Sequence, residues 1–248
     1  MTEIIKRGKS IQCMSAGSLK LIAIVTMLID HFMAGIFAPI YTSGYFTNAD
    51  ILKCGVIIYD VGRSIGRFAF PVFCFLLVEG FFYTKSRMKY MCNLVIFALV
   101  SEVPFDLLLK QKIDFTTQNV FFTLAISLAV IWGIDQIRKY LDKEPVIALF
   151  FQGMVILAGC LIAYGLHTDY TYRGVVLALI FYYYRNNRFL ACLVGYVWLL
   201  SSPWCITAFI AVLFYNGKRG IGLKYFFYVF YPVHLLLLYG LRVWLLGY

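Results

Sequence analysis

The chain has 248 residues, of which 62% are hydrophobic and 14% are charged, with 22 Lys and Arg against 12 Asp and Glu. Soluble domains are roughly 45–50% apolar and about 25% charged, so this composition excludes a soluble globular protein. The basic residues lie in short clusters between apolar runs, as in the cytoplasmic loops of membrane proteins, which argues against a nucleic-acid partner. The sequence therefore predicts an all-α integral membrane protein surrounded by membrane lipid.

A helix needs about 20 apolar residues to cross a bilayer. By that measure the sequence predicts a single domain over residues 1–248, a polytopic bundle of about nine transmembrane helices. The expected spans cover roughly 18–40, 65–84, 90–109, 117–136, 145–166, 173–184, 188–201, 203–216 and 223–246. The sixth, seventh and eighth are short, which leaves open one or two half-spans buried in protein. The stretch 41–64 carries little hydrophobic pattern and is expected to lie outside the membrane.

The basic residues also predict the orientation. With the N-terminus on the cytoplasmic side of a cell membrane, the cytoplasmic side carries 15 of the 22 Lys and Arg residues. These are Lys6, Arg7, Lys9, Lys20, Lys85, Arg87, Lys89, Arg138, Lys139, Lys143, Arg185, Arg188, Lys218, Arg219 and Lys224. Because positive residues are enriched in cytoplasmic loops, a cytoplasmic N-terminus is favoured.

The first predicted span places Asp30 and His31 side by side past its midpoint. An ionisable side chain within a span raises the free energy of membrane insertion by roughly 2.5–3.5 kcal/mol. Each such residue is therefore expected to have a structural or functional role. A carboxylate beside a histidine can fix the ring tautomer and raise its basicity, which suits a general base. The alternative is a structural polar pair that ties this helix to a neighbour. His234, two residues after Pro232 in the last span, can meet the same level from across the bundle.

The second and third spans carry three more acids. Glu79 has no cation within a turn on its own helix, so its partner is expected on another helix, or else its carboxyl is protonated. Glu102 and Asp106 are four residues apart and share a helix face, where they can hold a cation, orient a base or accept an amine. The alternative is a solvated pair at the helix end. Pro104 between them, like Pro71 in the second span, is expected to bend its helix.

The remaining candidates lie near the ends of spans. Arg67 can reach an anion in the bundle or extend its cation outward. Asn119 begins the fourth span, and Arg173 can rim a pocket from an outer turn or lie in a solvated loop. The seven cysteines are scattered, mostly in apolar runs, so free thiols are expected. None of the polar residues has metal-ligand spacing, and no metal is expected.

Several stretches together resemble the TraX family, which is named for the membrane protein that acetylates the N-terminus of conjugative F-type pilin. They are LKLIAIVTMLIDHF, RFAFPVFCFLLVEGFFYTKS, SEVPFDLLL, TQNVFFTLAISL, DYTYRGVVLALIFYY and YPVHLLLLYGLR, in the family's order over nearly the whole chain. The family in turn resembles multi-span membrane acyltransferases that take acyl groups from coenzyme A or similar donors. The motif positions carried over are Asp30, His31, Arg67, Pro71, Glu79, Gly80, Glu102, Asp106 and His234.

The resemblance implies a transmembrane acetyltransferase that transfers acetyl from acetyl-CoA to an amine or hydroxyl of a peptide or glycan acceptor, which includes a pilin-like N-terminus. In this scheme His31 is the base and Asp30 orients it, with Glu79 and His234 as further catalytic candidates. The oxyanion donor is Arg67, Asn119 or His234. The candidates for substrate binding are Arg67, Glu102, Asp106, Asn119 and Arg173.

Coenzyme A carries phosphates, which cations bind, and the cations gather on the predicted cytoplasmic side. The acyl donor is therefore expected to approach from that side. The candidates for its phosphates are Lys85, Arg87, Lys89, Arg138, Lys139 and Arg185.

A proton-coupled transporter or flippase is the alternative function, because buried acids and histidines on proline-broken helices also suit such a carrier. The lack of an inverted repeat in the sequence and the odd number of expected spans argue against it. A non-catalytic membrane scaffold is the third possibility, and it does not require Asp30 and His31 in lipid.

Overall fold

The computed structural model describes residues 12–43, 48–222 and 224–247. Over these residues the chain is helical, with two isolated β-bridges, which confirms the predicted all-α membrane bundle. Six helical segments are long and apolar enough to cross a membrane, so the chain is a multi-pass membrane protein. They are Ala16–Thr42, Ala49–Tyr83, Arg87–Lys110, Val120–Tyr140, Pro145–Gly165 and Tyr225–Leu246.

Three shorter apolar helices, Thr171–Tyr183, Arg188–Trp198 and Pro203–Leu213, correspond to the three short predicted spans. Whether each of them crosses the bilayer stays a prediction, because all three are below the length that a full crossing needs. Of the basic residues used to predict the orientation, Lys6, Arg7, Lys9 and the side chain of Lys224 lie outside the described part of the chain.

The helices divide into two compact units. Unit 1 comprises Met1–Phe73, Val103–Ile113 and Leu199–Tyr248, and unit 2 comprises Cys74–Glu102 and Asp114–Trp198. Helices α5 (Ala69–Tyr83) and α6 (Arg87–Lys110) each contribute to both.

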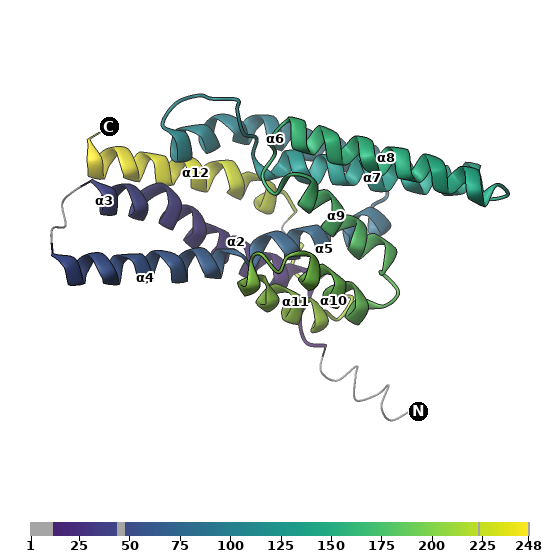
Figure 1. Cartoon of the computed structure of the whole chain (residues 1–248), viewed down its shortest axis with the longest axis horizontal. Coiled ribbons are helices and arrows are strands. Elements are labelled where there is room, and N and C mark those ends of the chain that lie inside the picture. The colour runs from purple at the N-terminus through teal and green to yellow at the C-terminus, as the bar shows by residue number, and fades with distance from the viewer. Residues whose placement is uncertain (1–11, 44–47, 223, 248) are drawn as a thin grey trace. The chain divides into compact units, whose positions relative to one another are not determined.

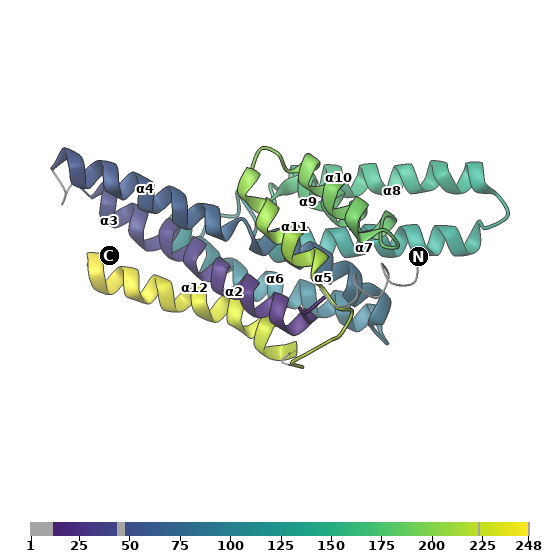
Figure 2. The ribbon, with the colours of Figure 1, turned by 90° about the horizontal axis from the view of Figure 1, so that it is seen from below.

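Unit 1 is built on long helices that lie side by side (Figures 1 and 2). Helix α2 (Ala16–Phe32) continues through the π-helix η1 (Met33–Phe37) into α3 (Ala38–Thr42). Helix α4 (Ala49–Gly66) and helix α12 (Lys224–Leu246) both pack against α2 and η1. The unit also contains η2 (Pro203–Cys205) and α11 (Ile206–Leu213). This packing brings together α2 and α12, the two helices that carry His31 and His234.

The loop that follows α11 returns to the start of α2. Met14 and Tyr215 form an isolated bridge, and the carbonyls of Lys218 and Arg219 accept the backbone N–H groups of the first two residues of α2. The first N–H groups of a helix have no partner within the helix, so the loop satisfies two donors that would otherwise be unpaired. The loop therefore fixes where α2 begins.

The stretch 41–64, predicted to lie outside the membrane as a segment without pattern, is largely helical. Helix α4 begins after Asn48, whose side chain accepts from the backbone N–H groups of the first turn. The buried residues of α4 are glycines, Gly55, Gly62 and Gly66. Hydrophobic periodicity is detected from large apolar side chains, so a helix that packs through glycine leaves little signal. The sequence pattern therefore did not predict this helix, and the position of the stretch outside the membrane stays a prediction.

Pro71 and Pro104, which were expected to bend the second and third spans, differ in their effect on the helix. The turn residues Arg67 and Phe68 separate α4 from α5, and Pro71 follows in the first turn of α5. The ring of a proline collides with the carbonyl four residues earlier, which here belongs to Arg67. The interruption therefore lies where Pro71 predicts it. Pro104 lies within α6, which stays a helix from Arg87 to Lys110.

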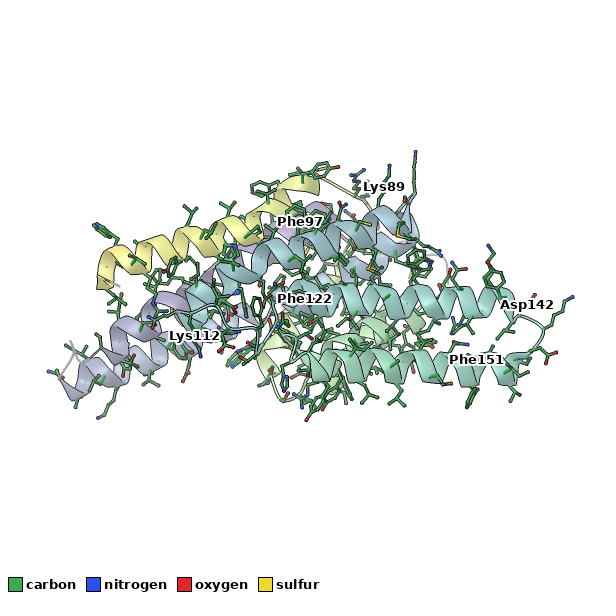
Figure 3. All side chains as sticks on the ribbon, turned by 90° about the horizontal axis from the view of Figure 1, so that it is seen from above. Lys89, Phe97, Lys112, Phe122, Asp142 and Phe151 are labelled. Carbon is green, nitrogen blue, oxygen red and sulfur yellow. The ribbon has the colours of Figure 1, made fainter. Side chains whose placement is uncertain are left out.

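Unit 2 contains α7 (Val120–Tyr140), α8 (Pro145–Gly165), α9 (Thr171–Tyr183) and α10 (Arg188–Trp198). Helices α7 and α8 form a hairpin, and α9 packs on both of them (Figures 1 and 2). Figure 3 shows Asp142 at the turn of this hairpin and Phe151 on α8. Most of the α8 side chains are exposed, including Leu149 and Leu157, as expected for a helix that faces lipid.

Candidate active site

Asp30 and His31 lie at the C-terminal end of α2, immediately before the π-helix η1. The N–H of Ala38 bonds to a carbonyl five residues earlier, so this turn holds one residue more than a turn of α-helix. Single π-turns occur frequently at functional sites. A β-carbon on Gly35 would lie 2.5 Å from Cδ1 of Leu108, so the wide turn packs closely against the last part of α6.

The rings of His31 and His234 form a hydrogen-bonded pair. Nδ1 of His31 lies 2.7 Å from Nε2 of His234, and the ring centroids are 5.0 Å apart. His234 is 4% exposed, and Tyr231 packs at a steep angle against both imidazoles. The structure thus brings together the two histidines that the sequence places in the first and last spans.

The backbone carbonyl of Phe230 gives the hydrogen bond of the histidine pair a direction. The carbonyl lies 2.8 Å from Nδ1 of His234 and can only accept, so in a neutral ring Nδ1 of His234 carries the proton. Nε2 of His234 then has a lone pair and accepts from Nδ1–H of His31. In turn, Nε2 of His31 has the lone pair of its own ring. The pair presents one basic nitrogen, on His31, that can take a proton from a nucleophile.

Asp30 does not orient the His31 ring as predicted. Its Oδ2 accepts from Nη1 of Arg63 at 2.7 Å, and the same Nη1 lies 3.4 Å from the Asp30 carbonyl oxygen. Neighbouring residues on a helix point about 100° apart. Asp30 therefore pairs with α4 while His31 pairs with α12, and the residue that orients the His31 ring is His234.

Arg63 is the residue of this site that the sequence analysis missed. It lies in the stretch predicted to be outside the membrane, 33 residues from Asp30 along the chain. An ion pair between separate helices leaves no periodic pattern in the sequence. The available signal was the spacing of Arg63 and Arg67, because residues four apart share one face of a helix.

Arg67 is the C-cap residue of α4, and its positive charge also acts on Asp30. The charges of two guanidinium groups, from Arg63 and Arg67, therefore act on the carboxylate of the residue before His31. The local charge is positive, which suits a place where a negative charge develops on an oxygen.

Glu102 and Asp106 each contact a partner of their own. Oε2 of Glu102 accepts from the backbone N–H of Asn119 at 3.1 Å and from its side-chain amide at 2.5 Å. An oxygen of Asp106 lies 2.7 Å from Nζ of Lys110, one helical turn along. Both acids are buried, Glu102 at 4% and Asp106 at 0% exposure, so the alternative of a solvated helix end is wrong.

Asn119 is the N-cap of α7. Its side-chain oxygen accepts from the N–H of Phe121, and its amide nitrogen donates to Glu102 and to the carbonyl of Ala98. Both amide hydrogens are therefore used within the protein. Asn119 consequently has no donor left for an oxyanion, and its role in the structure is to tie α6 to the start of α7.

Three of the arginines expected to bind the acyl donor come together in unit 2 over aromatic rings. Their guanidinium carbons lie between 4.1 and 5.5 Å from the ring centroids, and the rings contact one another. Cations attract the faces of aromatic rings, and this attraction holds the guanidinium groups in place. This arginine–aromatic cluster consists of Arg87, Arg138, Arg185, Phe81, Phe82, Tyr182 and Tyr183.

Arg138 differs from Arg87 in the charge of its partners. Nη1 of Arg87 lies 2.5 Å from Oδ2 of Asp135, so its charge is compensated within the protein. Arg138 donates from Nε to Oε1 of Gln152 at 3.1 Å and lies against two tyrosine rings, all of them neutral groups. Within the described residues, Arg138 thus holds a positive charge without a carboxylate.

Glu79 finds its partner on another helix segment, as expected. Its Oε1 lies 3.2 Å from Nε of Arg185, and its side chain is 13% exposed. A small pocket opens beside this ion pair, with Arg188 also on its wall and apolar side chains of α5, α9 and α10 around it. Glu79 belongs to unit 2, whereas the histidine pair belongs to unit 1. In this structure the contact of the Glu79 carboxylate is the ion pair with Arg185, at the wall of the pocket.

The other predicted binding residues lie at the surface. Lys85 is exposed in the turn between α5 and α6, and Lys139 is exposed at the end of α7. Arg173 lies in the first turn of α9, and its carbonyl accepts from the indole N–H of Trp198 at 3.0 Å. Because the tyrosines of the arginine–aromatic cluster lie at the last turn of α9, Arg173 is not part of that cluster.

Comparison with known proteins gives the family. The sequence profile of the family described as "TraX protein" matches residues 15–242. The "Probable fimbrial assembly protein FimC, serogroup H1" of Dichelobacter nodosus is 29% identical over 263 residues, covering 93% of this chain and 97% of that protein. No solved structure matches the chain. The match runs through both units and includes Asp30, His31, Arg63 and His234. The chain belongs to the TraX family.

Proposed function

We propose that the protein is a membrane acetyltransferase that transfers acetyl from acetyl-CoA to an amine or hydroxyl of a peptide or glycan acceptor. The observation that carries this proposal is the histidine pair, in which the Phe230 carbonyl and His234 leave Nε2 of His31 as the basic nitrogen. Membership of the TraX family supports acyl transfer, and the name of the Dichelobacter relative links that protein to fimbrial assembly. A pilin-like N-terminal amine is therefore the first acceptor to test.

In the proposed reaction the lone pair on Nε2 of His31 takes the proton from the acceptor amine or hydroxyl as it attacks the thioester carbonyl. The imidazolium that forms still donates from Nδ1 to His234, so the added charge is shared with a second ring. When the tetrahedral intermediate collapses, the carbon–sulfur bond breaks and the coenzyme A thiolate accepts the proton from His31. The products are the acetylated acceptor and free coenzyme A.

The oxyanion of the intermediate needs a donor, and the contacts narrow the predicted set. Asn119 and His234 have their donors committed to partners within the protein. Arg67, beside Asp30 at the end of α4, supports the role better because its charge already acts on this region of unit 1. We therefore assign the oxyanion to Arg67.

We assign the binding of the acetyl-CoA phosphates to the arginine–aromatic cluster. Lys85 and Lys139 are exposed, lie close to Arg87 and Arg138 in the sequence, and are assigned as further phosphate ligands. Arginine binds phosphate oxygens with two parallel hydrogen bonds, and Arg138 has no competing carboxylate among the described residues. Under the predicted topology these cations face the cytoplasm, where acetyl-CoA is available. The N-terminus is then cytoplasmic and the membrane is the cell membrane.

The experiment is acetyl transfer by the purified protein in lipid nanodiscs, with radiolabelled acetyl-CoA and a peptide carrying a pilin-like free N-terminus. A second reaction replaces the peptide by a hydroxyl-bearing oligosaccharide. The proposal predicts label in one of the acceptors, with one free coenzyme A thiol released for each acetyl transferred. A protein that is folded but neither binds acetyl-CoA nor releases its thiol would contradict the proposal and favour a transporter.

A further inference from the structure

The ion pair between Arg63 and Asp30 lies one residue from the histidine pair. Oδ2 of Asp30 is 2.7 Å from Nη1 of Arg63, and the two side chains are 18% and 26% exposed. The same guanidinium also reaches the Asp30 carbonyl in the last turn of α2 before the π-helix. One arginine thus binds both the side chain and the backbone of the residue before His31.

The charged and titratable groups around His31 come from each helix packed against η1 and the end of α2. Helix α12 contributes His234 and Tyr231, and α4 contributes Arg63 and Arg67. On α6, the acid Asp106 lies against Lys110. Asp30 is the residue before His31 in the chain, and Arg63 is the group that binds its carboxylate.

We propose that Arg63 is a positioning residue that holds the Asp30 carboxylate away from the histidine pair and thereby keeps the His31 ring neutral and reactive. The inference rests on the proposed function, in which a neutral His31 is the base. Its test by spectroscopy does not depend on an acetyl acceptor. Arg63 would not touch the substrate in this role.

The physical reason is the effect of a nearby carboxylate on an imidazole. An opposite charge within about 4–6 Å favours the protonated ring by roughly one to three pH units. A protonated His31 has hydrogen on both nitrogens and cannot accept a third. If Arg63 were absent, the carboxylate of Asp30 would lose its hydrogen-bonded partner, and only the charge of Arg67 would still act on it. A positive charge on the histidine pair would then be stabilised more than in the wild type. A larger fraction of the base would then be protonated at any given pH.

The same geometry predicts a compensating substitution. In Arg63→Met the carboxylate loses the cation that is hydrogen-bonded to it, whereas in the double variant Arg63→Met with Asp30→Asn both charges of the ion pair are gone. The double variant therefore restores the neutral surroundings of the wild-type ion pair. Asp30→Asn alone leaves the Arg63 cation beside the pair and disfavours a second positive charge on the rings.

The experiment is a pH titration of the protein labelled with ¹⁵N in its histidine rings, in nanodiscs. The ¹⁵N signals distinguish the two neutral tautomers from the protonated ring. For Arg63→Met we expect the midpoint of His31 protonation to move upward by about one pH unit or more, and for Asp30→Asn to move downward. In the double variant we expect the midpoint to return to the wild-type value.

The matched control is the second ion pair on α4, Asp50 with Lys53, whose side chains are 91% and 79% exposed. Replacing either residue should leave the histidine titration unchanged. If folded Arg63→Met titrates like the wild type, the proposal is overturned. If Arg63→Met does not fold, the titrations of Asp30→Asn and of the double variant test the proposal instead. A midpoint of His31 protonation that is unchanged in Asp30→Asn overturns the proposal as well. Absence of acetyl transfer by the wild type, with these shifts present, would instead count against the proposed function.

Discussion

A β-carbon on Gly66 would lie 2.3 Å from Oδ1 of Asp30, and even van der Waals contact between carbon and oxygen requires more than 3 Å. The backbone of α4 therefore rests directly on the carboxylate that Arg63 binds. Gly66 and Arg63 lie one turn apart on this helix, so the same close approach that admits the carboxylate also brings the guanidinium to it.

We expect Gly66→Ala to destabilise the protein, because the added methyl group must displace Asp30 or separate α4 from α2. Overfilling a packed site costs typically about 1–3 kcal/mol. The measurement is thermal unfolding of the purified protein in detergent. The control is Gly153→Ala on α8, where the new β-carbon meets nothing within 4 Å and the helix gains an alanine. Equal melting temperatures for the two variants would show that the contact at Gly66 is not restrictive.

Replacing Asn119 by Ala should destabilise unit 2 more than loss of an ordinary helix cap. The helix cap contributes about 1 kcal/mol to the free energy of unfolding. In addition, the buried Glu102 carboxylate would lose the amide donor of Asn119, which lowers the free energy of unfolding by about 1–3 kcal/mol more. The matched control is Asn48→Ala, which removes the N-cap of α4 at the surface without exposing a buried acid. Denaturant midpoints that fall equally in both variants would contradict the role given to Glu102.

The sequence was most informative about residues whose presence in lipid is costly. Asp30, His31 and His234 could be selected because each ionisable group in a span needs a reason, and Glu79 could be assigned a partner on another helix. The sequence also allowed His234 to meet the level of His31, but it did not predict Arg63 as the partner of Asp30. Asp30 and His31 point to different helices, and this choice depends on which helix packs on which side of α2.

The helix over 49–66 shows a second limit of prediction from sequence. Its contact surface is made of glycine, and the tightest contact is between Gly66 and a side chain on α2. A glycine that permits close approach looks in the sequence like a glycine that breaks a helix. Arg63 was missed as a consequence, because its segment was not expected to contact the first span.

Arg138→Gln should weaken acetyl-CoA binding and leave the chemical step unchanged. A hydrogen bond to a charged group contributes roughly 1.5–3 kcal/mol, so we expect KM for acetyl-CoA to rise about 10- to 100-fold at an unchanged kcat. The measurement is initial rate against acetyl-CoA concentration, at low and high salt. Lys143→Gln, at the exposed turn after α7, is the control for general loss of positive charge. A change in kcat alone would place Arg138 outside the donor site.

His234→Leu should lower kcat without changing KM for acetyl-CoA. The substitution removes the ring that accepts from Nδ1 of His31, so His31 can adopt the tautomer in which Nε2 carries the proton. We expect a smaller loss than the roughly 10²–10⁴-fold that removal of the base itself causes. Steady-state kinetics with ¹⁵N spectra of His31 check both statements. A wild-type rate together with a mixed tautomer population would show that the tautomer is unimportant.

If His31 is the base, its loss removes nearly all of the catalysis, and the measurement is acetyl transfer by His31→Ala per molecule of folded protein. Folding is monitored by monodispersity and melting temperature, and acetyl-CoA binding is measured in parallel. The control is His167→Ala, which removes an exposed histidine of unit 2. We predict a loss of about 10²–10⁴-fold in turnover with acetyl-CoA still bound, and no loss in the control. Normal turnover by folded His31→Ala would contradict the mechanism and transfer the role of base to another group.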